Sequence, residues 1–174
     1  MPVKITAMTA PLASPFLLPL TWRFCAFAEL SVHELAQIYR ARQQVFSIEQ
    51  HCVYLDADGR DAASHHLTAW SGEHAATLVV AYARLVAPGV AYAEPSMGRV
   101  ITIEAGRGRG LGRELVGRLL RYAQALYPGQ GVRISAQSHL EAFYAGFGFE
   151  IVGERYLEDG IPHTEMLLRA VNAS

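Results

Sequence analysis

The apolar positions of the chain repeat in two ways, at helical spacing in some segments and in short β-favouring runs in others. Residues 31–47 and 111–126 carry apolar side chains three and four positions apart, which predicts two amphipathic helices. We expect Ser31 to cap the first helix in a capping box completed by Glu34. The second helix is expected to end before Pro128.

The β-favouring runs predict strands that alternate with these helices. They cover residues 22–28, 66–71, 76–86, 97–103, 132–136, 149–156 and 163–168, and a third, short helix is predicted over residues 139–147. The resulting order, β-α-β-β-β-α-β-α-β-β, predicts an α/β (α+β) fold with a mixed central sheet of six to seven strands flanked by helices. Asp159 and Gly160 favour a hairpin before the last strand, with a connection longer than a two-residue turn.

The length of 174 residues predicts a single domain, which we assign to residues 22–174. Residues 1–21 are expected to be a poorly ordered N-terminal extension. Their apolar stretch follows a single lysine, Lys4, and faintly resembles a signal peptide. Because Pro11, Pro15 and Pro19 interrupt the stretch, an export signal is the alternative interpretation rather than the favoured one.

Composition narrows the classes of partner. The net charge of −1 gives no reason to expect a nucleic-acid or membrane partner. No apolar run is long enough for a transmembrane helix. Cys25 and Cys52 form neither a disulfide framework nor a metal-ligand pattern, so we expect a cytoplasmic protein without a metal. Cys52 is expected to pack as a small buried hydrophobe, with a thiol near a site as the alternative.

Glycine and positive charge are concentrated between residues 106 and 113, after a predicted strand and at the start of a predicted helix. Glycine lets the backbone approach a ligand, and a helix N-terminus offers free N–H groups. Clustered arginines here indicate a bound polyanion such as a pyrophosphate. A P-loop is excluded because no lysine is present, and a dinucleotide fingerprint fails because Leu111 and Arg113 stand where it needs glycine. A flexible turn that binds nothing is the remaining alternative.

Two motifs resemble the GNAT superfamily of N-acetyltransferases. Arg107, Gly110 and Gly112 form its Arg-x-x-Gly-x-Gly pyrophosphate motif, and residues 142–149 resemble its Phe-Tyr-x-x-x-Gly-Phe signature. Segments within residues 45–59, 136–140 and 158–163 are similar to the ElaA-type subfamily, and the whole resemblance covers about residues 22–170. Gln137 stands where an asparagine is common, which puts one cofactor contact in doubt.

The resemblance implies an acetyl-CoA-dependent N-acetyltransferase that moves an acetyl group to a primary amine by direct attack in a ternary complex. The acceptor could be a small molecule, a peptide or a protein, and a homodimer is expected from the family alone. Acetyl-CoA, the co-substrate, would lie between residues 100–102 and the strand after Gly131. The residues implied to bind it are Val100, Ile101, Thr102, Arg107, Gly108, Arg109, Gly110, Leu111, Gly112, Arg113, Gln137 and Tyr144.

The resemblance also implies catalytic roles. Tyr144 is at the family's position for the acid that protonates the leaving thiolate, with a buried structural tyrosine as the alternative. Glu49 is a candidate for the base that deprotonates the amine, or else a structural carboxylate. Glu49, His66 and His163 are candidates for the acceptor site, and the two histidines are further candidates for the base.

Three acidic residues, Asp56, Asp58 and Asp61, follow the first helix. They could favour a cationic acceptor, although a solvated acidic loop is the preferred interpretation, and their spacing is not that of a calcium loop. Because fold alone does not establish catalysis, a non-catalytic CoA or acyl-CoA sensor is the alternative function, and thioester hydrolysis is a third.

Overall fold

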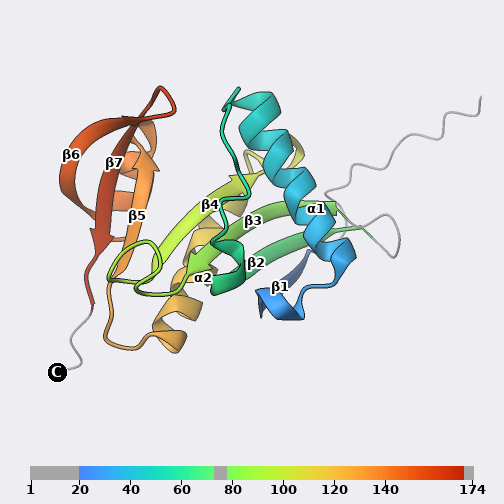
Figure 1. The fold of residues 1–174 in the computed structure, drawn as a ribbon, viewed down its shortest axis with the longest axis horizontal. Coiled ribbons are helices and arrows are strands. Elements are labelled where there is room, and N and C mark those ends of the chain that lie inside the picture. The colour runs from blue at the N-terminus through green and yellow to red at the C-terminus, as the bar shows by residue number, and fades with distance from the viewer. Residues whose placement is uncertain (1–19, 73–77, 171–174) are drawn as a thin grey trace, which may run out of the picture.

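The computed structural model describes residues 20–72 and 78–170. Seven strands form one mixed sheet in the order β1-β2-β3-β4-β5-β7-β6 (Figure 1). The strands are β1 (Thr21–Ala26), β2 (Ser64–Ser71), β3 (Leu78–Val86), β4 (Ser96–Thr102), β5 (Val132–Gln137), β6 (Glu150–Glu158) and β7 (Ile161–Leu168). The predicted element order and the mixed α/β class are confirmed. The N-terminal extension and the alternative export signal were predicted almost wholly within residues 1–19, which lie outside the described residues.

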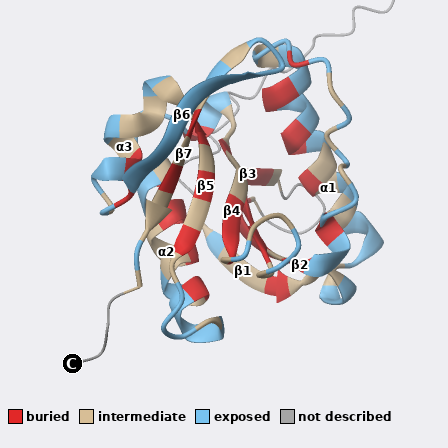
Figure 2. Ribbon diagram, turned by 60° about the vertical axis from the view of Figure 1, so that its left-hand side comes forward, coloured by how far each residue is buried: buried red, intermediate tan, exposed pale blue. Residues whose placement is uncertain are grey.

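Helices cover both faces of the sheet. Figure 1 shows α1 (Val32–Gln43) in front of β2, β3 and β4, and α2 (Leu111–Leu126) behind them. Leu115, Leu119 and neighbouring apolar residues of α2 pack in one core, whereas Ile38 of α1 packs in a second. The buried segments in Figure 2 accordingly gather on the strands and on the inner sides of the two helices. Within the described ranges, no helix is long and apolar enough to cross a bilayer.

Helix α1 begins as predicted but ends differently. Ser31 accepts a hydrogen bond from the backbone N–H of Glu34, whose carboxylate accepts one from the backbone N–H of Ser31, so the capping box is confirmed. The helix then widens into a π-helical segment, Gln44–Glu49, which extends beyond the predicted end. Such segments are rare and often occur at functional sites. This one places Glu49 near the start of β3 and the end of β4.

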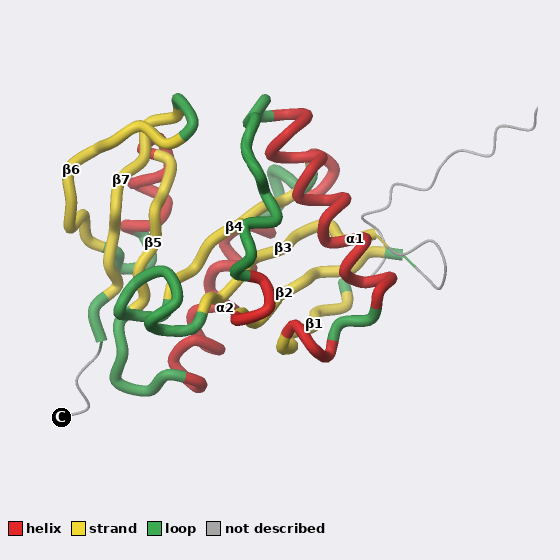
Figure 3. Tube along the Cα trace, viewed as in Figure 1, coloured by secondary structure: helices red, strands yellow, loops and turns green. Residues whose placement is uncertain are grey.

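Strands β4 and β5 separate soon after they meet. Their parallel pairing in the described strands consists of Ser96 beside Arg133, supported by a hydrogen bond from the Arg133 N–H to the Pro95 carbonyl. In Figure 3 the two tubes diverge from this region. The edge of β4 that faces β5 is therefore open beyond Ser96, while its other edge pairs with β3. This separation creates the space for the site described below.

The last two strands form a tight hairpin. Glu158 pairs with Ile161, so that Asp159 and Gly160 alone make the turn, with φ values of 51° and 78°. Two successive residues of positive φ define the type I′ turn that Asp-Gly sequences favour. The expected longer connection was wrong because the strand ladder extends through Glu158 and Ile161. β6 is the outer strand, and Figure 2 shows it exposed along its length.

Candidate active site

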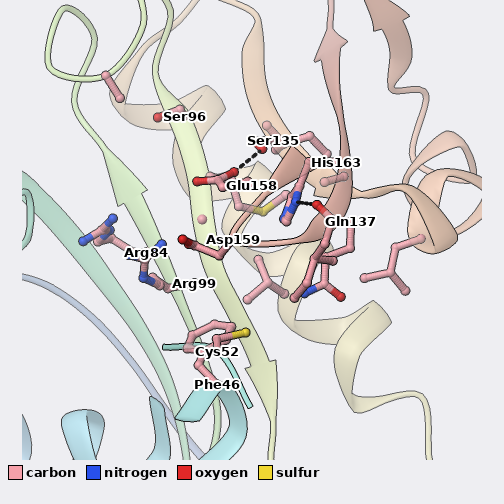
Figure 4. Close-up of a pocket in the computed structure, with 18 of the residues that line it drawn as sticks. Phe46, Cys52, Arg84, Ser96, Arg99, Ser135, Gln137, Glu158, Asp159 and His163 are labelled. Atoms are coloured by element: carbon pink, nitrogen blue, oxygen red, sulfur yellow. Dashed lines mark hydrogen bonds between the residues drawn. The ribbon is translucent and has the colours of Figure 1, made fainter. Parts of the chain in front are cut away.

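A cavity of about 500 Å³ opens where β4 and β5 separate. Residues 96–100 of β4 form one wall, residues 134–137 of β5 form another, and Tyr144 of α3 (Glu141–Ala145) also lines the cavity. The β6–β7 hairpin contributes the remaining wall. Figure 4 shows side chains that line this space from these elements, from β3 and from the segment after α1, namely Phe46, Cys52, Arg84, Arg99, Ser135, Gln137, Glu158, Asp159 and His163.

A bulge in β4 shapes the first wall. Tyr82 of β3 pairs with Ile101 and Arg84 pairs with Gly98, so two residues of β4, Arg99 and Val100, stand opposite one residue of β3. Arg99 has a φ of 53°, the left-handed region that a residue with a Cβ seldom adopts. A bulge changes the direction of its strand and of its side chains. Here it accompanies the divergence of β4 from β5 and brings Gly98, Arg99 and Val100 to the cavity.

The three aspartates after α1 form an ion-pair cluster, not a solvated loop. Asp56 accepts hydrogen bonds from Arg42 and Arg99, Asp58 from Arg84 and Arg99, and Asp61 from Arg42 and Arg84, at 2.7–3.3 Å. Arg42 and Arg84 are 0% and 2% exposed. The preferred interpretation of these aspartates was therefore wrong. Their charge is compensated by arginine, so they do not provide a free anionic surface for a cationic acceptor.

The arginines of the cluster keep Asp58 and Asp61 ionised. Burial would raise the pKa of Asp58, but hydrogen bonds and charge from Arg84 outweigh burial and hold that pKa well below its usual range. Asp61 behaves alike: burial opposes ionisation, and Arg84 and Arg42 lower its pKa. Removal of one partner from a buried pair leaves an uncompensated charge, which is strongly destabilising. The cluster thus fixes residues 50–61 against β3 and β4, beside the cavity.

The glycine-rich loop precedes α2 at the end of β4. Gly108 and Gly110 both have a φ of 76°, and Gly110 is the N-cap of α2. A Cβ on either glycine would meet no protein atom within 4 Å, so the space over this backbone is open. Leu111 is buried beneath the loop, which leaves its backbone rather than its side chain for a ligand. Open backbone at a helix N-terminus fits the expected pyrophosphate.

The arginines of this loop differ in their surroundings. Arg107 donates to the carbonyl of Thr102 and forms an ion pair with Glu49. The Arg113 guanidinium lies 5.9 Å from the ring centre of Phe143 and 5.1 Å from that of Phe147. Arg109 lies in the exposed part of the loop. Arg107 thus holds the end of β4 in place, and the negative charge of Glu49 compensates the positive charge of Arg107.

Glu49 does not line the cavity that contains Tyr144. Its carboxylate pairs with Arg107, accepts a hydrogen bond from Gln44 at 3.4 Å, and lines a separate hollow between α1 and the ends of β3 and β4. Both carboxylate oxygens of Glu49 are thus engaged by these two side chains. This geometry favours the structural alternative for Glu49.

Tyr144 is 6% exposed and lines the cavity. Burial raises its pKa to about 12, so its hydroxyl stays protonated at neutral pH. Its ring is held edge-on by Phe143 and Phe149 at centroid distances of 5.1 and 5.9 Å. A protonated hydroxyl in a fixed position is able to act as a general acid.

The two candidate histidines occupy different environments. His66 is 1% exposed; one ring nitrogen is 2.8 Å from the Tyr82 hydroxyl and the other is 3.1 Å from the Asp61 carbonyl oxygen. Burial lowers the pKa of His66 and favours the neutral ring. His66 does not line the cavity, and both nitrogens are already used, so this geometry is that of a core histidine. His163, by contrast, projects into the cavity (Figure 4).

Gln137 and Cys52 also lie at the cavity. The Gln137 side-chain amide donates to the Gln50 side-chain oxygen at 3.1 Å, which joins β5 to the segment after α1. Cys52 is a buried free thiol that lines the cavity, so it is both a packed hydrophobe and a group near the site. Burial raises the pKa of Cys52, which keeps the sulfur protonated.

Comparison with known proteins identifies the family. Residues 43–170 match the model of the acetyltransferase (GNAT) domain. The chain belongs to the GNAT acetyltransferase family. Relatives of this chain include a UPF0039 protein of Synechocystis, 43% identical over 86% of this chain and 96% of its own length. Protein ElaA of Escherichia coli is 37% identical over 87% of this chain and 98% of its own length, so the ElaA-type resemblance is confirmed.

Solved structures agree with this GNAT assignment. An acyl-CoA N-acyltransferase from Pseudomonas aeruginosa superposes with a TM-score of 0.81 at 40% identity, covering 87% of this chain and all of that one. The crystal structure of Escherichia coli ElaA superposes with a TM-score of 0.80 at 36% identity over the same shares. The chain is therefore a GNAT-fold member of the acyl-CoA N-acyltransferases.

Several cavity residues were missed by the sequence analysis. The cavity between β4 and β5 is also lined by residues that stand outside the two superfamily motifs, namely Arg84, Arg99, Tyr92, Ser135, Tyr156, Glu158 and Asp159. Tyr156 and Glu158 are two positions apart on β6, and residues two positions apart lie on the same face of a strand. That pattern was available in the sequence, but it does not reveal that this face borders a cavity.

Proposed function

We propose that this chain is an acetyl-CoA-dependent N-acetyltransferase that acts on a primary amine, with residues 22–174 as one catalytic domain. The observation that carries the proposal is the cavity between β4 and β5, which is lined by a protonated tyrosine, together with the open glycine loop that follows β4. A thioester in this space would meet open strand backbone on one side and the hydroxyl of Tyr144 on the other.

The residues present fit a CoA thioester. Open backbone at Gly108 and Gly110, at the start of α2, suits a diphosphate, because helix N-termini attract anions. The edge of β4 over Val100–Thr102 has no pairing with β5 in the described strands, so its backbone is available to an extended pantetheine arm. Gln137 can contribute an amide to the same arm. When bound, acetyl-CoA supplies an activated acetyl group.

Catalysis would rest on positioning and proton transfer. The bulged backbone near Val100 would donate an N–H to the thioester carbonyl and stabilise the negative charge that develops there. Tyr144 would give its proton to the sulfur as the carbon–sulfur bond breaks. General acid catalysis of this kind contributes about 10²- to 10⁴-fold to a rate.

Release of free CoA, followed with and without amines, tests the proposal. The panel should contain small primary amines, free amino acids and lysine peptides, with acetyl-CoA as donor and longer acyl-CoA thioesters in parallel. Amine-dependent release with matching acetylated product is the expected result. Equal release without amine would make the chain a thioester hydrolase, and tight binding without release would make it a CoA sensor. A longer thioester turned over in preference to the acetyl ester would refute acetyl specificity.

A further inference from the structure

We infer that His163 is the general base of this site and removes the proton from the acceptor amine through Nε2. The inference rests on the proposed function and names a residue for a step that function requires. An amine arrives largely as ammonium at neutral pH, since alkylammonium groups such as lysine titrate near 10.4. It has no lone pair for attack until a nearby group takes a proton.

The tautomer of His163 follows from one hydrogen bond. Its Nδ1 lies 2.9 Å from the carbonyl oxygen of Ile161, two residues earlier on β7. A carbonyl oxygen accepts and never donates, so Nδ1 must carry the hydrogen. In the neutral ring, Nε2 then carries the lone pair. Throughout residues 20–72 and 78–170, nothing forms a hydrogen bond or ion pair with Nε2. A positioned imidazole with a free lone pair is the arrangement expected of a general base.

The position of His163 places it on the same cavity as the acid. Its partner across the β5–β7 ladder is Gln137, the last residue of β5, on the side where β4 and β5 separate. The Tyr156 ring packs beside the imidazole at a centroid distance of 6.1 Å. Tyr144 enters the cavity from α3. Acid and base therefore come from different elements and border one space, as attack and departure at a single carbonyl carbon require.

The rival base is engaged elsewhere. Glu49 pairs with Arg107 and borders the hollow on the α1 side, and it does not line the Tyr144 cavity. His66 is buried with both nitrogens bonded. Of the three candidates raised by the sequence, His163 combines access to the cavity with an uncommitted lone pair.

The proposed reaction moves protons through His163 and Tyr144. Nε2 takes one proton from the acceptor ammonium and becomes imidazolium. The amine nitrogen forms a bond to the carbonyl carbon of the acetyl thioester, and the carbon–sulfur bond breaks, with its electron pair on sulfur. Tyr144 protonates that sulfur. The amide nitrogen releases its second proton to water, the imidazolium loses its proton to water, and Tyr144 regains one, so that both side chains return to their starting states.

Other charged groups border the cavity and must be separated from His163 in a pH experiment. The β6–β7 hairpin contributes Tyr156, Glu158 and Asp159 to the lining. The segment between α1 and β2 contributes Cys52 and Arg60, and strands β3 and β4 contribute Arg84 and Arg99. The carboxylates of Glu158 and Asp159 are the main alternatives to His163 as the group behind an acidic limb of the kcat–pH profile. Glu158 accepts a hydrogen bond from Ser135 at 3.2 Å, and Asp159 has no hydrogen-bond or ion-pair partner in the described part of the chain.

The test compares His163→Gln, His163→Ala and the control His33→Gln with wild type. His33 is exposed in the first turn of α1 and does not line the cavity. We expect His163→Gln to lower kcat by about 100-fold or more, with acetyl-CoA affinity within about threefold. The acidic limb of the wild-type kcat profile should disappear in this variant and persist in Glu158→Gln, Asp159→Asn and Glu49→Gln. Added imidazole should restore part of the activity of His163→Ala.

A second readout needs no substrate. The ¹⁵N shifts of the neutral His163 ring in the free protein should report hydrogen on Nδ1 and a lone pair on Nε2. The inference is overturned if Nε2 carries the hydrogen, if His163→Gln keeps wild-type kcat, or if the acidic limb vanishes with Glu49→Gln instead. A wild-type protein without amine-dependent CoA release would refute the proposed function itself, whereas an active wild type with an equally active His163→Gln would refute the base alone.

Discussion

Arg99 Nε donates to Asp56 Oδ1 at 2.7 Å, across 43 positions of sequence. Arg99 is also the bulged residue of β4 whose φ of 53° is unfavourable for a side chain with a Cβ. Such a conformation costs about 1–2 kcal/mol and persists where surrounding contacts impose it. The ion pair with Asp56 and stacking of the guanidinium over Tyr54, 5.2 Å from its ring centre, supply those contacts. The wall of the cavity thus depends on a residue outside the catalytic motifs.

Two substitutions of Arg99 separate the ion pair from the backbone strain. Arg99→Ala and Arg99→Gly both remove the pair, so both should lower the free energy of unfolding, by about 1–3 kcal/mol for a lost charged hydrogen bond. The alanine keeps the strain that the glycine relieves, and it should be the less stable by about 1 kcal/mol. Urea unfolding measures both values. An alanine variant more stable than the glycine variant would contradict a strained bulge held by the pair.

The aspartate cluster predicts an acid-sensitive fold. The folded-state pKa values of Asp58 and Asp61 are lowered, so their contribution is fully present above the unfolded pKa, about 3.9, and is lost as pH falls through the lower folded values. The free energy of unfolding should therefore decline below about pH 5. Denaturant unfolding at a series of pH values measures this slope. Asp58→Asn should be less stable at neutral pH and show a shallower decline, whereas an equally steep decline would assign the acid sensitivity to other groups.

The glycine loop is tested by a matched pair of substitutions. Gly110 and Gly129 have φ values of 76° and 73°, and an added Cβ at either meets no atom within 4 Å. Gly110→Ala and Gly129→Ala should therefore lose similar stability, about 1 kcal/mol each. Only Gly110→Ala should weaken CoA binding, by about tenfold or more, because the methyl group would occupy the space over the loop. Equal affinity of both variants for CoA would place the diphosphate elsewhere.

Tyr144→Phe tests the proposed acid. The hydroxyl is protonated at neutral pH because burial raises its pKa to about 12. Its removal should lower kcat by about 100-fold while acetyl-CoA affinity changes little, since the ring remains in place. Tyr127→Phe, at the end of α2 and outside the cavity, serves as the control. Unchanged turnover of Tyr144→Phe, measured by CoA release with a saturating amine, would remove Tyr144 from the mechanism.

Local patterns predicted most of the secondary structure. The capping box at Ser31 and the apolar stripe of α2 are short-range signals, because hydrogen bonds and packing within a few residues decide them. The type I′ turn at Asp159 was also encoded locally, but its length depends on how far the β6–β7 ladder extends, which side-chain pairing across the strands decides. The π-helical end of α1, Gln44–Glu49, carried no comparable signal in the hydrophobic pattern.

Long-range pairing explains where the sequence was misread. Asp58 looked like a solvated loop residue because its partners, Arg84 and Arg99, lie 26 and 41 residues away. For the same reason Glu49 could not be assigned to Arg107, 58 residues later, before the fold was known. His66 and His163 were indistinguishable in the sequence, since burial of one and exposure of the other to a cavity are properties of the assembled sheet. The motifs drew attention to the glycine-rich loop and to Tyr144, and the fold adds the other residues that line the cavity.

Every proposed role depends on a bound CoA thioester, so the decisive experiment is calorimetric titration of the folded wild-type protein with CoA and with acetyl-CoA. We expect saturable binding of one molecule per chain for both ligands, weakened in Gly110→Ala and retained in Tyr144→Phe and His163→Gln. No detectable binding of either ligand by well-folded protein would contradict it.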